Sequence, residues 1–169
     1  MEFETLYQEL ANSAEIVQTL LSGITQAEAQ IRPAPESWSI LEVVCRLYDE
    51  EVNDFRPRLD VMLHRPTEDF APNNTQEWVT ERKYNEQNLS DMLGKFLAER
   101  DKSLNWLRGL SGANWEAPYT TPWRNMKAGD MFASWVAHDT YHMRQLVELR
   151  HARIVRLAEP NDTSYAGDW

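Results

Sequence analysis

The spacing of the apolar residues constrains this chain more than any other feature of its sequence. Along four long segments they recur at steps of three and four residues, which is the period of one face of an α-helix. No segment shows the alternation that is typical of paired strands. The repeating positions include Leu6, Leu10, Ala14, Val17, Leu21 and Ile24 near the start, and Met131, Trp135, Leu146 and Leu149 near the end. The pattern predicts an all-α protein folded as a four-helix bundle.

Local signals place the second helix. Ser39 is followed three residues later by Glu42, which is the spacing of a capping box at a helix start. Pro57 lies well inside the same segment and predicts a kink or an end there, with a helical continuation through residues 58–64.

Three further helical segments follow the second helix. The stretch "EWVTERKY" predicts a short extra helix before the third long helix, and the fourth long helix is expected from about Lys127 to about Arg156. A chain of 169 residues has the length of one domain. We therefore expect a single bundle domain over residues 1–169, of which residues 158–169 form a C-terminal tail.

Charge and cysteine content narrow the classes of partner and compartment. The net charge is −10 and the basic residues are scattered, which argues against binding to nucleic acid or to an anionic membrane surface. The single cysteine, Cys45, excludes an internal disulfide and fits a reducing cytosol. The first ten residues are acidic and amphipathic, and no apolar run approaches the ~20 residues of a membrane span. These features predict a cytoplasmic protein.

Two histidines on the last apolar stripe are the first candidates for chemistry. His138 and His142 are four residues apart and would share one helix face toward the bundle interior. Buried imidazoles need partners, and a divalent metal held by facing helices is one option, while an acid or a carbonyl is the other. The stretch also resembles the HExxH of zinc proteases, but Asp139 replaces the glutamate and no third ligand follows, so a protease is not favoured.

Several stretches together resemble the DinB-like superfamily of bacterial four-helix bundles. They are "WSILEVVCRLYDEE", "MFASWVAHDTYHMRQL", "EWVTERKYNEQNLSDML" and the closing "YAGDW". The resemblance implies an up-up-down-down bundle, often a homodimer. It also implies a divalent metal held by three histidines, one from the second helix and two from the fourth. In some relatives such a metal activates a low-molecular-weight thiol, bacillithiol or mycothiol, in transfer or isomerisation reactions.

The sequence departs from this family pattern at the position of the first histidine, which falls on Arg46. A guanidinium stays protonated and cannot bind a metal. One reading is a metal-free site in which Arg46 pairs with an acid. In a second reading Glu50, one turn after Arg46, joins the two histidines as a carboxylate ligand, with Asp49 as the alternative to Glu50. Two histidines and one carboxylate suit Zn, Ni or Fe. In a third, Arg46 binds a carboxylate or phosphate of a substrate.

These readings lead to two expected functions. The first is a metal-dependent enzyme, similar to thiol transferases or hydrolases, with His138, His142 and Glu50 as metal ligands, Arg46 as an anion-binding group, and Asp49 and Asp139 orienting the ligands from behind. The second is a metal-free, non-catalytic bundle that acts as a stress-related binding protein. The sequence identifies no catalytic residue and no particular small-molecule substrate.

Overall fold

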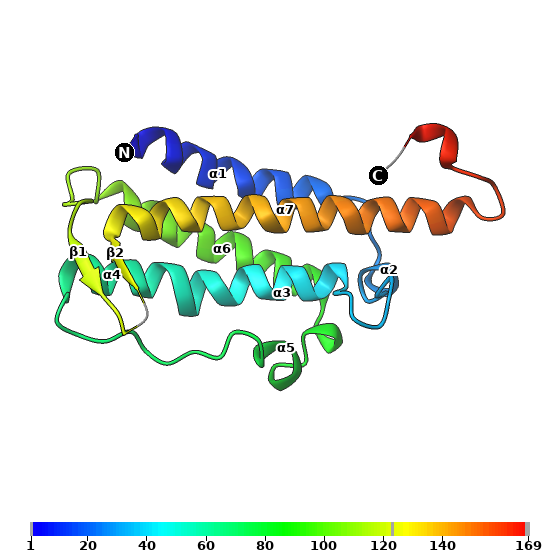
Figure 1. Cartoon of the computed structure of the whole chain (residues 1–169). Helices are drawn as coiled ribbons and strands as arrows, with labels where there is room; N and C mark the ends of the chain where they lie inside the picture. The colour runs from blue at the N-terminus through cyan, green and yellow to red at the C-terminus, as the bar shows by residue number, and fades with distance from the viewer. Residues whose placement is uncertain (1, 123, 168–169) are drawn as a thin grey trace.

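The computed structural model describes residues 2–122 and 124–167 and consists mainly of helices (Figure 1). Four helical rods pack side by side, and the second rod is built from two α-helices joined by a π-helical turn. This confirms the predicted all-α four-helix bundle. The rods are α1 (Phe3–Leu20), α3 (Ile40–Glu50) with η1 (Glu51–Phe55) and α4 (Arg56–His64), α6 (Leu89–Arg108), and α7 (Ala128–Ala158).

Contacts at the helix ends define the direction of each rod. Phe3 at the start of α1 packs on Phe132 at the start of α7, and Arg150 far along α7 donates to the Leu20 carbonyl at the end of α1, so these two helices are parallel. Ser39, which caps α3, donates to Asn85 just before α6, so α3 and α6 begin at the same end.

The four rods therefore run up, down, down and up, as Figure 1 shows, and this order differs from the up-up-down-down order that the family resemblance implied. The physical reason lies in the connections. The connection through α2 (Gln26–Ala29) stays at one end of the bundle and folds the chain straight back after α1. Residues 65–88 instead cross the length of the bundle and return the chain to the end where α3 begins.

The short elements lie in the connections between the rods. The predicted extra helix is present as α5 (Trp78–Glu81), followed by the single turn η2 (Tyr84–Glu86). The expectation of no strand pair was wrong, because β1 (Pro118–Thr120) and β2 (Asn125–Lys127) form an antiparallel hairpin. These strands are too short to show alternation, and stacking of Tyr119 on Phe70, with ring centroids 4.5 Å apart, anchors the hairpin.

The end of the chain follows a long last helix. The helix α7 extends to Ala158, and the turn η3 (Ser164–Ala166) lies in the predicted tail, of which residues 168 and 169 lie outside the described part. No helix in the described ranges is both long enough and apolar enough to cross a lipid bilayer.

The interior consists of two apolar clusters separated by a layer of polar side chains. One cluster surrounds Val44 and Phe96, and the other surrounds Leu10 and Phe132. Each rod contributes a buried polar residue at the level between the clusters: Ser13, Glu51, Arg100 and Asp139. The candidate site lies at this same level along the bundle.

Local sequence signals explain how the second rod presents its side chains. Ser39 and Glu42 form the capping box predicted for α3. The π-helix η1 begins directly after Glu50 and ends before Pro57, which has no N–H to continue the α-helical ladder. A π-helix has more residues per turn than an α-helix, so the second rod is wider immediately after Glu50. It then continues as α4, as the sequence predicted.

Candidate metal centre

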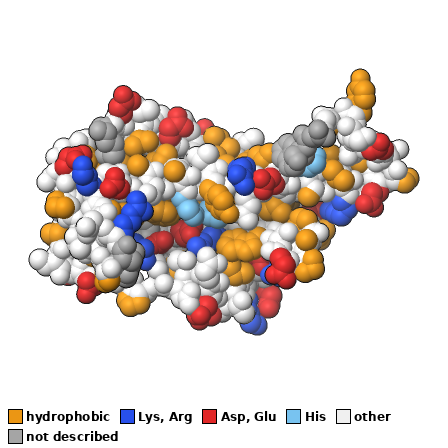
Figure 2. Space-filling view, in the orientation of Figure 1, with side chains coloured by type: hydrophobic (Ala, Val, Ile, Leu, Met, Phe, Trp, Pro, Cys, Tyr) orange, Lys and Arg blue, Asp and Glu red, His pale blue; other side chains and the backbone are white. Residues whose placement is uncertain are grey.

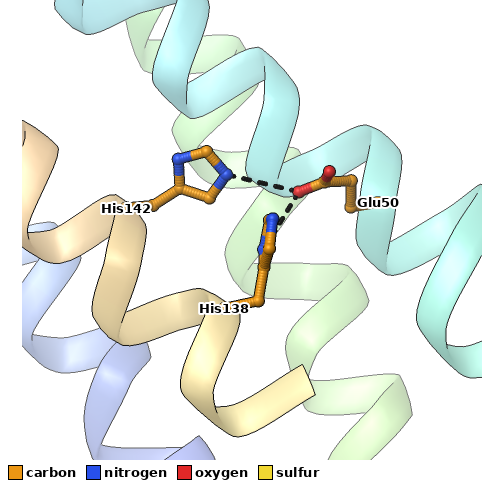
Figure 3. A group of neighbouring side chains, drawn as sticks. All are labelled: Glu50, His138 and His142. Atoms are coloured by element: carbon orange, nitrogen blue, oxygen red, sulfur yellow. Dashed lines mark ion pairs between the residues drawn. The ribbon is translucent and has the colours of Figure 1, made fainter. Parts of the chain in front are cut away.

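Glu50, His138 and His142 converge between α3 and α7 (Figure 3). Glu50 Oε2 lies 3.3 Å from His138 Nδ1 and 3.4 Å from His142 Nε2. One potential ligand atom from each residue lies within 4.8 Å of the other two. Both rings point from α7 toward the same carboxylate oxygen (Figure 3), so the structure brings the predicted set of residues together in space.

The hydrogen bonding of His142 leaves a lone pair directed at Glu50. His142 Nδ1 lies 3.0 Å from the amide oxygen of Gln145, which only accepts hydrogen bonds, so the proton of the neutral ring is on Nδ1. His142 Nε2 then faces Glu50 Oε2 as acceptor against acceptor. Neither atom has a hydrogen-bond partner among the described residues, and both are buried. Sequence reasoning missed Gln145, although its position three residues after His142 was a usable signal.

Arg46 lies beside this group but does not point at the histidines. Its Nε donates to the other carboxylate oxygen of Glu50 at 2.5 Å, and its Nη1 donates to the Thr75 carbonyl. The guanidinium also lies 5.9 Å from the ring centre of Trp38 and 5.8 Å from that of Trp78. Arg46 therefore orients Glu50 so that its second oxygen remains directed at the histidines.

Asp49 is held away from the histidines by other partners. The Tyr84 hydroxyl donates to one Asp49 oxygen at 2.5 Å, and Arg82 contacts the other at 2.6 Å. Because successive helix residues differ by about 100°, Asp49 faces the α5–η2 segment when Glu50 faces α7. The structure therefore does not bring Asp49 into the metal set, nor does it show Asp49 orienting a histidine.

Asp139 also has a different role from the expected one. Its carboxylate accepts hydrogen bonds from Arg100, at 2.5 and 3.1 Å, and from Ser13. No hydrogen bond joins it to His138 or His142 in the described part of the chain, so Gln145 takes the orienting place that we expected for Asp139.

The polar layer behind the site centres on Arg100, which is 1% exposed. Arg100 binds both oxygens of Glu51, at 3.0 and 2.9 Å, and Trp135 Nε1 donates to Glu51 at 3.2 Å. Glu51 and Asp139 are the immediate neighbours of Glu50 and His138 in the chain. One buried cation therefore ties together the two helix segments that carry the candidate ligands.

Burial shapes the protonation of two groups near the site. Burial lowers the pKa of His138 below its ordinary range, and the nearby Glu50 carboxylate opposes this only in part. The neutral imidazole that binds metals is thereby favoured. Burial raises the pKa of the Cys45 thiol to about 12, and its sulfur contacts the Tyr84 carbonyl, so Cys45 is an inert core residue.

An open pocket of about 1130 Å³ lies against the histidines. His138, Tyr141, His142 and Gln145 line it from α7, and Trp38 and Arg46 line it from the side of α3. In Figure 2, histidine atoms near the middle of the molecule adjoin acidic, basic and hydrophobic side chains. The side chain of His138 is 29% exposed and that of His142 is 4% exposed, so a small molecule would meet His138 first.

A sequence model of the DinB superfamily matches residues 9–146. The chain belongs to the DinB superfamily. This confirms the family resemblance noted in the sequence. YfiT from Bacillus subtilis, described as "a probable metal-dependent hydrolase with an unusual four-helix bundle topology", has a similar structure, with a TM-score of 0.78 and 16% identity over 89% of this chain and 86% of YfiT. At this identity the likeness shows a common fold. No curated protein sequence matches the chain.

The donor set of this DinB-superfamily chain fits a divalent metal. Zinc holds nitrogen and oxygen ligands at about 2.0–2.2 Å, so the ligand atoms of a tetrahedral site lie roughly 3.3–3.6 Å apart. The separations of 3.3 and 3.4 Å from Glu50 Oε2 to the two nitrogens fall in this range. A cation among them would also satisfy the buried atoms that have no partner.

Proposed function

We propose that this protein is a divalent-metal-dependent hydrolase or transferase that acts on a small molecule in the pocket beside His138. One observation carries the proposal: two buried acceptor atoms, Glu50 Oε2 and His142 Nε2, face each other without a hydrogen-bond partner among the described residues. Desolvated acceptors cost free energy unless a proton or a cation lies between them. Two histidines and one carboxylate form a set that suits Zn, Ni or Fe and leaves positions open.

The residues around the set each have a defined task. Gln145 keeps the His142 proton on Nδ1 and so keeps Nε2 free to bind. Arg46 holds one oxygen of Glu50 and leaves the other available. Burial keeps His138 neutral near pH 7. Trp38 and Leu149 add apolar surface to the pocket wall.

A bound divalent metal would supply Lewis acidity and lower the pKa of a water or thiol that it binds. The choice between hydrolysis and transfer to a low-molecular-weight thiol then depends on the molecule that shares the pocket with the metal. The description of YfiT as a probable metal-dependent hydrolase supports the hydrolase branch. The thiol branch rests on the wider family resemblance.

Metal content is the direct test of the proposal. Protein expressed without a histidine tag and purified without added metal should contain about one divalent ion per chain by elemental analysis. His142→Ala should remove it, because the substitution deletes a ligand at the buried end of the set. His64→Ala is the matched control, since His64 is a half-exposed histidine on α4 paired with Asp60. A metal-free wild type that also fails to take up added zinc or nickel would refute the proposal.

The ion pair between Arg46 and Glu50 supports a second candidate, the metal-free binding bundle. With Nε 2.5 Å from Glu50 Oε1, the guanidinium already compensates the carboxylate charge. A proton on one histidine would then form a hydrogen bond to the second oxygen of Glu50, and no metal would be needed. This candidate predicts that added zinc or nickel leaves the thermal unfolding midpoint unchanged, whereas a bound metal raises it.

We further propose that the protein is a cytoplasmic homodimer. Ile154 and Leu157, near the end of α7, are 52% and 53% exposed and form part of an apolar surface that a second chain would cover. Light scattering of the purified protein tests the dimer, and the mass of a single chain at micromolar concentration would contradict it.

A further inference from the structure

Arg46 has hydrogen-bonding capacity that the protein does not use. Its side chain is buried, with Arg46 only 8% exposed, yet it lines the pocket. Of its N–H groups, one on Nε binds Glu50 and one on Nη1 binds the Thr75 carbonyl. Nη2 makes no hydrogen bond to any described residue. A guanidinium offers N–H groups on all three nitrogens, so those of Nη2 remain available on a residue that lines the pocket.

The surroundings hold this guanidinium in one orientation. Trp38 and Trp78 lie within 6 Å of its central carbon, and Glu50 and the Thr75 carbonyl hold two of its nitrogens. A group restrained in this way loses little entropy when it binds a ligand, which favours tight recognition by its free N–H groups.

The charge balance of the site calls for an anion once a metal is bound. Glu50 compensates Arg46, and the two histidines are neutral as ligands, so a divalent cation would leave the centre with an uncompensated positive charge. The other acidic residues of the pocket lining are Glu36 and Glu148, and Glu148 is paired with Arg144 at 3.0 Å. An anion bound beside Arg46 would compensate the charge that remains at the centre.

We propose that the small molecule bound in this pocket carries an oxyanion group, a carboxylate or a phosphate, that accepts hydrogen bonds from the free N–H groups of Arg46 next to the metal site. This inference rests on the proposed function and adds the substrate class to it. The oxyanion is held by charge-assisted hydrogen bonds and by the net positive charge of the loaded centre. Neutral molecules of the same size lack both contributions.

Cobalt-substituted protein tests the inference by a binding measurement. The visible absorption of bound Co²⁺ is followed while succinate, inorganic phosphate or the neutral analogue succinamide is added. Succinate or phosphate should change the spectrum with saturation, and succinamide should not. The better of the two anions identifies the group as carboxylate or phosphate. In Arg46→Gln the anion should bind at least about tenfold more weakly, because a charge-assisted hydrogen bond is lost.

The controls separate this inference from the proposed function. Arg82→Gln is the matched variant, since Arg82 lies 4.2 Å from the Trp78 ring but is not part of the pocket lining, and it should bind the anion as the wild type does. If Arg46→Gln no longer binds cobalt, the anion affinity of the wild type is compared with that of Arg46→Lys instead, because lysine keeps a cation beside Glu50. Cobalt binding with equal anion affinity in wild type and Arg46 variants, or with no anion binding at all, would overturn the inference alone. A wild type that binds no metal would overturn both.

Discussion

Replacing Arg100 by methionine tests whether the polar layer of the bundle is held together by charge. Arg100 makes two hydrogen bonds to Glu51, at 3.0 and 2.9 Å, and two to Asp139, at 2.5 and 3.1 Å. None of the three side chains is more than 4% exposed. Arg100→Met fills a similar volume but leaves two buried carboxylates without their cation.

The magnitude follows from what remains around the carboxylates. Removing one partner of a buried ion pair costs about 3–5 kcal/mol. Glu51 keeps the Trp135 N–H and Asp139 keeps the Ser13 hydroxyl, so each retains one neutral donor and the two losses do not add in full. We expect Arg100→Met to lower the free energy of unfolding by about 3–5 kcal/mol, which for a domain of this size lowers the unfolding midpoint by roughly 6–20 °C.

Urea unfolding followed by circular dichroism measures this loss. Arg144→Met is the matched control, because Arg144 and Glu148 form an exposed pair on α7, and it should change stability by less than about 1 kcal/mol. Adding Glu51→Gln and Asp139→Asn to Arg100→Met removes the buried charges and should restore most of the loss. Arg100→Met with the stability of the wild type would refute the reasoning that these carboxylates are buried in their charged form.

Three further predictions concern single positions. Burial raises the pKa of the Cys45 thiol from 9.0 to about 12, so the unfolded chain loses this proton first as pH rises and stability should fall above about pH 9. Urea unfolding should show a smaller fall in Cys45→Ala than in the wild type. The same dependence of stability on pH in both proteins would contradict this prediction. Ser39→Ala should cost about 0.5–2 kcal/mol of stability, since Ser39 caps α3, and an unchanged urea midpoint would argue against the capping box. Glu50→Gln should weaken metal binding at least about tenfold in competition with a chromogenic chelator, while Asp49→Asn leaves it unchanged; equal effects of the two would contradict the assignment of Glu50.

The fold was largely predictable because helical periodicity is a local signal. The stripes that begin at Leu6 and end at Leu149 place all four rods, and the capping box at Ser39 and the break at Pro57 place the second rod. The β1–β2 hairpin was not predictable from periodicity, because its strands are three residues long. The order of helix directions was also missed, since it depends on where the crossover of residues 65–88 ends.

The site was predictable as far as helix geometry reaches. Helical spacing placed His138 and His142 on one face, and Glu50 was chosen one turn after Arg46, the position that the family resemblance marked. The structure brings the three residues together. The contacts of Asp49 could not be predicted, because its partners Tyr84 and Arg82 come from a segment whose path helical spacing does not define.

The buried Arg100 network depends on contacts among distant parts of the chain. Ser13, Glu51 and Asp139 come from three other rods. A signal was nevertheless present: Arg100 lies four residues after Phe96 and seven before Leu107, on the buried stripe of α6. A charged residue at such a position needs buried partners of opposite charge.

An anomalous difference map tests the central claim most directly. Crystals grown with zinc and measured at its absorption edge should show one strong peak between α3 and α7, about 2.0–2.2 Å from Glu50 Oε2, His138 Nδ1 and His142 Nε2. The absence of a peak there, with the Glu50 carboxylate still directed at both rings, would contradict the claim that these residues hold a metal.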